Sequence, residues 1–307
     1  MGNVRDGIIL VDKNEGETSF EAAGRVGRIL KIRKVGHAGT LDPFATGLLI
    51  VLLGQGTKLF PYLASGAKEY TGILRLGVET DTQDVHGEIL NVTPVPEFVP
   101  EELRARARNF VGEIEQVPPR FSAVRYKGKR AYEYARKGID VSLGARKVKI
   151  HSFDILSVDL PEVTVRVVCS GGTYVRALVS DFGKALGTGA HLTALRRLAS
   201  GPFDIRDAVN INKVSGPDQK DALCERIIPL GNGLPHLRAV KIGDIMARKI
   251  RNGYQPKMRD LRGPGDDLGG TGQEIKLLRG EDLVAIARVP DKAHGNGVGL
   301  KVMRVFK

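Results

Sequence analysis

The chain has 307 residues, 42% of them apolar, which is enough for about two domains with a proper hydrophobic core. It has no apolar run near the roughly 18 to 20 residues that span a bilayer and no signal-peptide pattern, and its two cysteines, Cys169 and Cys224, exclude a disulfide framework and a thiolate zinc site. These features predict a reducing, cytoplasmic location without membrane attachment. The 47 Lys and Arg against 35 Asp and Glu give a net charge of +12, which favours a polyanionic partner such as nucleic acid, with a merely basic protein as the alternative.

The N-terminal segment predicts a strand followed by a helix. Residues 7–13 (GIILVDK) have the apolar character of a strand, and Thr18 and Glu21 have the spacing of a capping box that opens a helix. Basic residues crowd the other faces and the end of this helix, within residues 25–34. The end of the predicted helix is therefore basic and leads into the next segment.

The stretch VGHAGTLDPFATGLL, residues 35–49, places a histidine and an aspartate five positions apart among apolar residues and glycines. Because Pro43 follows it, Asp42 is expected on extended backbone that cannot join a helix. Residues 48–53 (LLIVLL) predict a short buried strand. We therefore expect His37 and Asp42 on a loop that leads into a core strand, although an aspartate before a proline is, taken alone, usually a turn residue.

An alternating pattern from residue 69 to residue 92, with a turn rich in Thr, Asp and Gly in its middle, predicts a hairpin. Asp81 and Asp84 suit that turn better than they suit metal ligation, so no metal site is predicted. Residues 101–111 predict a short charged helix.

The basic tract, residues 125–137, interleaves its cations with Tyr126, Tyr132 and Tyr134. Such mixing suits phosphate contacts combined with base stacking. The alternative is a solvated helix whose tyrosines, Tyr132 and Tyr134 above all, pack on the core.

The second half of the chain predicts two further strands, a helix and a small separate module. Residues 146–158 and 162–170 have strand patterns, and two glycines then release the chain into a helix with Arg176 in about its first turn. Residues 231–237 resemble a linker, after which the chain becomes rich in Gly and short apolar runs. A small β-rich module is therefore expected over residues 236–307.

Standard catalytic signatures are absent from the sequence. It contains no phosphate-binding GxxxxGKS/T loop, no HExxH, no paired CxxC, no EF-hand loop and no GxSxG elbow. What remains is the lone carboxylate of Asp42, with Tyr70, Tyr174 and Arg176 elsewhere in the chain. A buried carboxylate without a partner tends to be protonated, whereas a nearby arginine would hold it ionised as a nucleophile or base.

Several separated stretches together resemble the TruB family of tRNA pseudouridine-55 synthases, in the family's order. They are GIILVDKNEGETS (7–19), GHAGTLDPFATGLL (36–49), KEYTGILRLG (68–77) with TDTQDVHGE (80–88), PPRFSAVRYKGKRAYEYARKG (118–138), and CSGGTYVRAL (169–178) followed by GAHLTALRRLASGPF (189–203). The HAGTLDP stretch is highly specific for the TruB and dyskerin-type branch of pseudouridine synthases. The resemblance is close over about residues 5–205, and the C-terminal segment resembles the PUA-type RNA-binding module that many members carry.

The resemblance implies an α+β pseudouridine synthase fold, with a mixed, largely antiparallel sheet, flanking helices and a small C-terminal β-rich PUA-type module. It places a catalytic domain in residues 1–232 and a PUA-like RNA-binding domain in residues 236–307. Within the catalytic domain, about residues 77–150 would carry the extra elements that grip the T arm of tRNA.

The resemblance also implies the activity and the residues that perform it. Family members flip out a uridine of the tRNA T-loop, detach its base from C1′ and rejoin it through C5, without a cofactor. Asp42 matches the catalytic aspartate, Arg176 the arginine that pairs with it, and Tyr70 the tyrosine that stacks on the flipped base. Asp42 would attack C1′ or the base, or assist deprotonation at the sugar, and the sequence leaves these open.

Four further positions match substrate-binding residues of the family. His37 matches the histidine that fills the place vacated by the flipped base. Tyr174 and Leu195 match residues that line the pocket, and Lys13 matches a supporting position near the active site. A strand tyrosine, a core leucine and a surface lysine are the respective alternatives.

The resemblance implies a monomer that acts on the T arm of tRNA without an obligate protein partner. One alternative is a dyskerin-like subunit whose target is chosen by a guide RNA, but the tract GKRAYEYARKG is typical of the stand-alone enzyme. The other alternative is a non-catalytic tRNA-binding or tRNA-folding protein. The presence of Asp42 and Arg176 argues against it.

Overall fold

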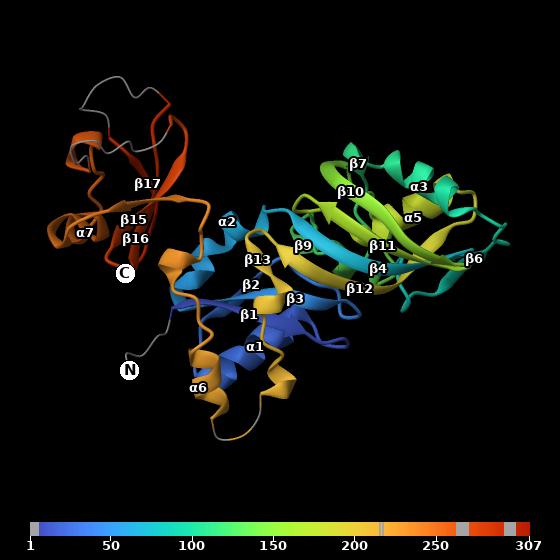
Figure 1. The fold of residues 1–307 in the computed structure, drawn as a ribbon, viewed down its shortest axis with the longest axis horizontal. Helices are drawn as coiled ribbons and strands as arrows, with labels where there is room; N and C mark the ends of the chain where they lie inside the picture. The colour runs from blue at the N-terminus through green and yellow to red at the C-terminus, as the bar shows by residue number, and fades with distance from the viewer. Residues whose placement is uncertain (1–5, 215, 217, 262–269, 292–298) are drawn as a thin grey trace.

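One large sheet forms the centre of the molecule (Figure 1). The computed structural model describes residues 6–214, 216, 218–261, 270–291 and 299–307. In the order of the sheet, its main path comprises β1 (Gly7–Lys13), β3 (Thr46–Leu53), β12 (Ala190–Ser200), β4 (Lys68–Leu76), β11 (Glu162–Cys169), β10 (Arg146–Asp159) and β7 (Gly112–Gln116). Two short strands extend it, β2 (Val35–Ala38) beside β3 and β13 (Phe203–Asp204) beside β12. Among the described strands of this sheet, β12–β3 is the only parallel pair, so the expected mixed, largely antiparallel sheet is confirmed.

Helices accompany the large sheet. They are α1 (Ser19–Leu30), α2 (Phe60–Ala64), α3 (Pro100–Arg108), α4 (Ala131–Ala135), α5 (Val175–Ala185) and α6 (Gln219–Cys224), with the short 3-10 helices η1 (Gly54–Leu59), η2 (Ile205–Asp207), η3 (Ile211–Lys213) and η4 (Leu230–Asn232). Of these, α1, α3 and α5 pack on strands of the sheet. The α1 helix begins with the capping box expected from Thr18 and Glu21, since each residue accepts a backbone hydrogen bond from the other.

The apolar run LLIVLL forms most of the strand β3, which is buried on both faces. Its residues from 47 to 53 are all buried, and successive side chains enter two different cores. Leu49 and Val51 pack with α1, whereas Leu48 and Ile50 pack on the opposite face with α2 and the C-terminal module. A strand that is covered on both faces requires apolar residues at every position rather than at alternate ones.

The hairpin predicted over residues 69–92 is wrong in its extent. The β4 strand belongs to the central sheet, where it pairs with β11 and β12. The hairpin itself is shorter, with β5 (Val78–Thr80) paired to β6 (Ile89–Val92). Gly77, at a φ of 84°, separates β4 from β5, and alternation alone cannot distinguish a hairpin partner from a strand that pairs elsewhere.

The β5–β6 hairpin, α3 and β7 lie at one end of the molecule (Figure 1). The basic tract lies nearer the middle of the molecule and folds as β8 (Arg125–Tyr126), β9 (Lys129–Arg130) and α4. Tyr126 and Tyr134 pack edge to face with ring centroids 5.8 Å apart. The tract is therefore a small ordered unit with its cations on the outside.

The C-terminal module lies at the opposite end (Figure 1). Its sheet has the order β14 (Arg238–Lys241), β15 (Glu274–Arg279), β16 (Asp282–Arg288) and β17 (Lys301–Val305), accompanied by α7 (Asp244–Arg251) and the 3-10 helix η5 (Met258–Asp260). Phe306 is buried in a core shared with β1 and β3, and the Lys58 ammonium donates to the Val305 carbonyl at 2.6 Å. The expected β-rich module is present and packs directly on the part of the chain that contains β1, β3 and η1.

Within the described part of the chain, no helix has the length and apolar content needed to cross a membrane.

Candidate functional site

The loop that carries Asp42 is fixed from both sides. On one side, the backbone N–H of Leu41 donates to Ser19 Oγ at 2.8 Å, and that hydroxyl donates back to the Leu41 carbonyl at 3.1 Å. On the other side, the fully buried Lys13 ammonium donates to the carbonyls of Pro43, Asn14 and Glu17. The first turn of α1 and the end of β1 therefore set the backbone position of Asp42.

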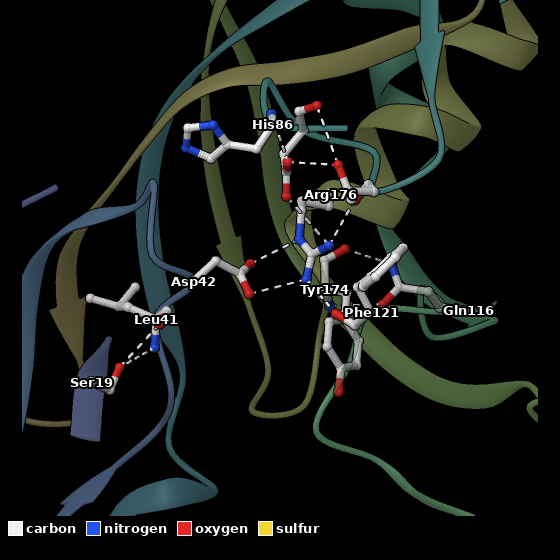
Figure 2. A network of polar contacts seen from close by, with 10 residues as sticks. Ser19, Leu41, Asp42, His86, Gln116, Phe121, Tyr174 and Arg176 are labelled. Atoms are coloured by element: carbon white, nitrogen blue, oxygen red, sulfur yellow. Dashed lines mark hydrogen bonds and ion pairs between the residues drawn. The ribbon is translucent and has the colours of Figure 1, made fainter. Parts of the chain in front are cut away.

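Asp42 and Arg176 form a two-point ion pair (Figure 2). Arg176 Nε lies 2.8 Å from Oδ2 of Asp42, and its Nη2 lies 3.0 Å from Oδ1. The Arg176 side chain is only 3% exposed, whereas that of Asp42 is 34% exposed. The guanidinium thus holds the carboxylate from behind and leaves it open to a ligand.

The remaining donors of Arg176 are also occupied. Nη1 donates to the Thr82 carbonyl at 2.7 Å and Nη2 to the Phe121 carbonyl at 3.0 Å. Arg176 Nη1 also lies 3.5 Å from Oδ2 of the buried Asp84. Arg176 therefore ties the Asp42 loop to the β5–β6 turn and to the segment that precedes the basic tract.

Asp84 does more than form the turn that the sequence predicts. Its Oδ1 accepts from Thr82 Oγ1 at 2.7 Å and from the His86 backbone at 3.1 Å, which are the contacts of a turn residue. Its second oxygen, however, faces Arg176. The turn pattern hid this contact because nothing in the local sequence indicates which residue lies opposite.

Tyr174 precedes α5 and lies beside Arg176 (Figure 2). Its backbone N–H and carbonyl both bond to the Gln116 side-chain amide, at 2.8 and 3.0 Å. Burial raises the pKa of the Tyr174 phenol. The phenol therefore stays protonated at neutral pH.

Tyr70 and His37 are two further candidates with a shifted pKa. Burial raises the pKa of Tyr70, while Arg197 opposes the rise through its charge and its hydrogen bonding to the phenol. Burial lowers the pKa of His37, and the charges of Arg197 and Arg130 lower it further. His37 Nδ1 is buried, and no described residue is its hydrogen-bond partner. A neutral imidazole ring is the consequence.

Leu195 lies on β12 opposite Gly72 of β4, within the core that also contains Tyr70. Lys13 is not a surface lysine, because its ammonium is buried among backbone carbonyls, and burial lowers its pKa to about 8. The carboxylate of Asp42 acts electrostatically on both Lys13 and Tyr70. The fold thus gathers the candidate residues around the Asp42 loop.

The sequence interpretation missed Arg197. This residue is 1% exposed and donates to the carbonyls of Leu48 and Gly39. It is the second arginine of the LRR run, and its neighbour Arg196 is a partly exposed partner of Asp12. Adjacent arginines on one strand point to opposite faces, but the sequence does not tell which face is buried.

Among the described residues, no group of three or more His, Cys, Asp or Glu side chains is placed to hold a metal ion.

Comparisons with known proteins agree with this architecture. Residues 27–175 match the profile described as TruB family pseudouridylate synthase (N terminal domain), and residues 176–234 match the tRNA pseudouridylate synthase B C-terminal domain. The chain is 40% identical to tRNA pseudouridine synthase B of Syntrophus aciditrophicus (strain SB), with 98% of each chain covered. It is 39% identical to the protein of that name from Geobacter sulfurreducens (strain ATCC 51573 / DSM 12127 / PCA), covering 98% of this chain and 99% of the relative.

Among solved structures, the chain is similar to one described as a Cbf5-Nop10-Gar1 complex, with a TM-score of 0.75, 26% identity, and 99% of this chain and 86% of the other covered. A second, an H/ACA RNP bound to a substrate RNA, has a TM-score of 0.74 and 25% identity, with the same shares covered. The near full-length identity to the curated relatives and the two adjoining profiles confirm the resemblance found in the sequence: the chain belongs to the TruB family of pseudouridylate synthases.

Proposed function

We propose that this protein converts uridine 55 in the T-loop of tRNA to pseudouridine, with Asp42 as the residue that starts the reaction. The observation that supports this most directly is the Asp42–Arg176 pair, a partly open carboxylate held at two points by a buried guanidinium, in a chain of the TruB family. The reaction is an isomerisation, in which the bond from C1′ to N1 breaks and a bond from C1′ to C5 forms.

The target uridine must leave its stack before a protein carboxylate can reach it, which costs a few kcal/mol. His37 is proposed to fill the space that the uridine vacates. A neutral ring suits stacking between bases, and the lowered pKa of His37 keeps the ring neutral at physiological pH. Tyr70 is proposed to stack on the flipped base, with Tyr174 and Leu195 lining the pocket and Lys13 holding the loop.

Two surfaces are proposed to hold the tRNA. The first is the insertion at about residues 77–150, whose basic tract presents cations and half-buried tyrosines. Residues 77–103 contain no lysine or arginine, so the phosphate contacts of the insertion are assigned to its second half. The second surface is the PUA-like module, residues 236–307, which follows a catalytic domain of residues 1–232. The enzyme is proposed to act as a cytoplasmic monomer without a cofactor or an obligate protein partner.

The test is release of tritium from C5 of uridine in tRNA transcripts, with wild type and Asp42→Asn side by side. A transcript with cytidine in place of uridine 55 is the control. We expect release by wild type from the uridine 55 transcript alone. Asp42→Asn should release nothing while its tRNA affinity stays within about threefold, because phosphate contacts elsewhere carry binding. Normal turnover by Asp42→Asn would refute the assignment.

A guide-dependent synthase is the second candidate, favoured by the likeness to the Cbf5 complexes. Tight binding of tRNA by wild type without any release of tritium would support this candidate or a tRNA-folding role. Release by the isolated chain would exclude both as the sole function.

A further inference from the structure

Arg197 lies where three strands of the central sheet meet. On β12 it is the register partner of Tyr70 of β4 on one side and of Gly47 of β3 on the other. Its side chain is 1% exposed. Gly47 has a φ of 99°, and a Cβ there would lie 2.3 Å from the Arg197 carbonyl oxygen. The close approach of β3 and β12 at this point therefore requires glycine.

The guanidinium of Arg197 reaches the segment that carries His37 and Asp42; His37 lies on β2 rather than on the loop expected from the sequence, and Asp42 lies on the loop that follows. Nε donates to the Leu48 carbonyl at 2.7 Å, and Nη2 donates to the Gly39 carbonyl at 3.1 Å. Gly39 stands between His37 and Asp42 in the chain and has a φ of 88°. A Cβ at Gly39 would lie 3.4 Å from Arg197 Nη1, so the loop passes directly over the guanidinium.

Arg197 is a buried cation without an ion-pair partner in the described part of the chain. Its hydrogen bonds there go to backbone carbonyls, whereas Arg176 and Arg196 each pair with a carboxylate. Burial of a charge that is not paired with an opposite charge is expensive, and an apolar side chain would fill such a position at a lower cost. A stability role alone therefore does not account for an arginine here.

Arg197 also lies between two strands of the site, β2 and β4, that are not neighbours in the sheet. His37 lies on β2, which pairs with β3, and Tyr70 lies on β4. In the sheet, β3 and β12 separate β2 from β4. The Arg197 charge acts on both His37 and Tyr70.

We propose that Arg197 is a positioning residue of the isomerisation: its guanidinium fixes the segment from His37, at the end of β2, to Asp42, in the loop after it, against Tyr70, so that base displacement and attack occur in one geometry. The residue does not contact the Asp42 carboxylate and transfers no proton. The inference rests on the proposed function, since it needs the roles assigned there to Asp42, His37 and Tyr70.

The test compares Arg197→Met and Arg197→Lys with wild type in single-turnover tritium release at saturating tRNA. Loss of the guanidinium should lower the rate about 10²-fold, the size expected when reacting groups are misplaced by about 1 Å. Affinity for tRNA should stay within about threefold. Arg197→Lys keeps the charge but not the two-carbonyl geometry, so we expect it to restore part of the rate, to about 10-fold below wild type.

The matched control is Arg166→Met. Arg166 lies on β11, on the same sheet, and its exposed guanidinium pairs with Glu69 at 2.8 Å, beside Tyr70 in sequence. The single-turnover rate of Arg166→Met should equal that of wild type. Thermal unfolding of every variant separates a folding defect from a loss of positioning.

A rate within threefold of wild type in folded Arg197→Met would overturn the inference. So would a loss of affinity equal to the loss of rate, or a failure of both variants to fold at the assay temperature, since each outcome makes Arg197 a purely structural residue. Asp42→Asn in the same assay distinguishes failure of the proposed function from failure of this inference. Activity in Asp42→Asn refutes the proposed function. An inactive Asp42→Asn together with a normal rate in Arg197→Met refutes only this inference.

Discussion

Arg176 and Lys13 differ from the cations of the basic tract in the hydrogen-bond and ion-pair partners of their side chains. Arg176 donates to Asp42 and to the carbonyls of Thr82 and Phe121, and Lys13 donates to three carbonyls. Lys129 and Lys137 are exposed, and no ion pair or hydrogen bond of their side chains is found within the described residues. One group of cations orders the protein, and the other is available to a ligand.

The difference shows that the cations behind the positive net charge have two roles: the buried ones order the protein and the exposed ones are available to bind phosphate. A buried cation is stable only with its donors satisfied, so its position is determined and it can place a catalytic group. An exposed cation on a flexible stem contributes little to folding but binds phosphate and releases counterions. Loss of the first kind should therefore change rate or stability, and loss of the second kind should change affinity and its salt dependence.

Among the variants that test this difference, Arg176→Lys should have the largest effect. A lysine keeps the charge but cannot bond both oxygens of Asp42 while also reaching the carbonyls of Thr82 and Phe121. We expect a single-turnover rate about 10³-fold lower, with tRNA affinity within about threefold. A normal rate in this variant would show that two-point support of Asp42 is unnecessary.

Lys13→Met tests the second buried cation through the pH dependence of stability. Burial lowers the pKa of Lys13 from 10.5 to about 8, so between these values the unfolded chain binds more protons than the folded one. The free energy of unfolding of wild type should therefore rise relative to that of Lys13→Met as the pH increases from 8 to 10.5.

The expected gain is about 3 kcal/mol, or about 10²-fold in the folding equilibrium. Urea unfolding of both proteins across this range measures the difference, in which the titration of all other groups cancels. A difference that does not change with pH would mean that the Lys13 ammonium titrates normally.

Asp84→Asn should have a smaller effect on rate. The variant keeps the acceptor for Thr82 and the His86 backbone but removes the charge that lies 3.5 Å from Arg176 Nη1. We expect the rate to fall by on the order of 30-fold, because interactions between charged groups contribute about 2 kcal/mol when they are buried. Asp81→Asn, in the same turn, is the control, and equal losses in the two variants would assign the effect to the turn rather than to Arg176.

Replacement of both Lys129 and Lys137 by alanine should have the smallest effect. The dissociation constant for tRNA should increase about 10-fold, and the salt slope of binding should decrease by about 2, one for each phosphate that the variant no longer neutralises. The rate at saturating tRNA should equal that of wild type. Lys213→Ala with Lys220→Ala makes the same charge change at exposed positions near α6. A salt slope that falls equally in both double variants would remove the basic tract from the interface.

Several local elements could be predicted because their causes are local. The capping box of Thr18 and Glu21 and the apolar run of β3 each contain the interactions that define them. The hairpin was predicted too long because the partners of β4 are β11 and β12, whose sequences lie far along the chain. Asp84 was interpreted as a turn residue alone for the same reason, since Arg176 is distant in sequence.

The sequence by itself determined the family, the reaction class and the identity of Asp42 and Arg176 as partners, because several stretches resemble the family in its order and HAGTLDP is specific for the TruB and dyskerin-type branch. Only the tertiary structure decided how deeply each cation is buried and what it touches. Arg196 and Arg197 are adjacent and chemically identical, yet one pairs with Asp12 near the surface and the other lies beneath the loop that carries Asp42. The physical reason is that burial and hydrogen-bond partners depend on which strands pack on either side, and distant parts of the chain supply those strands.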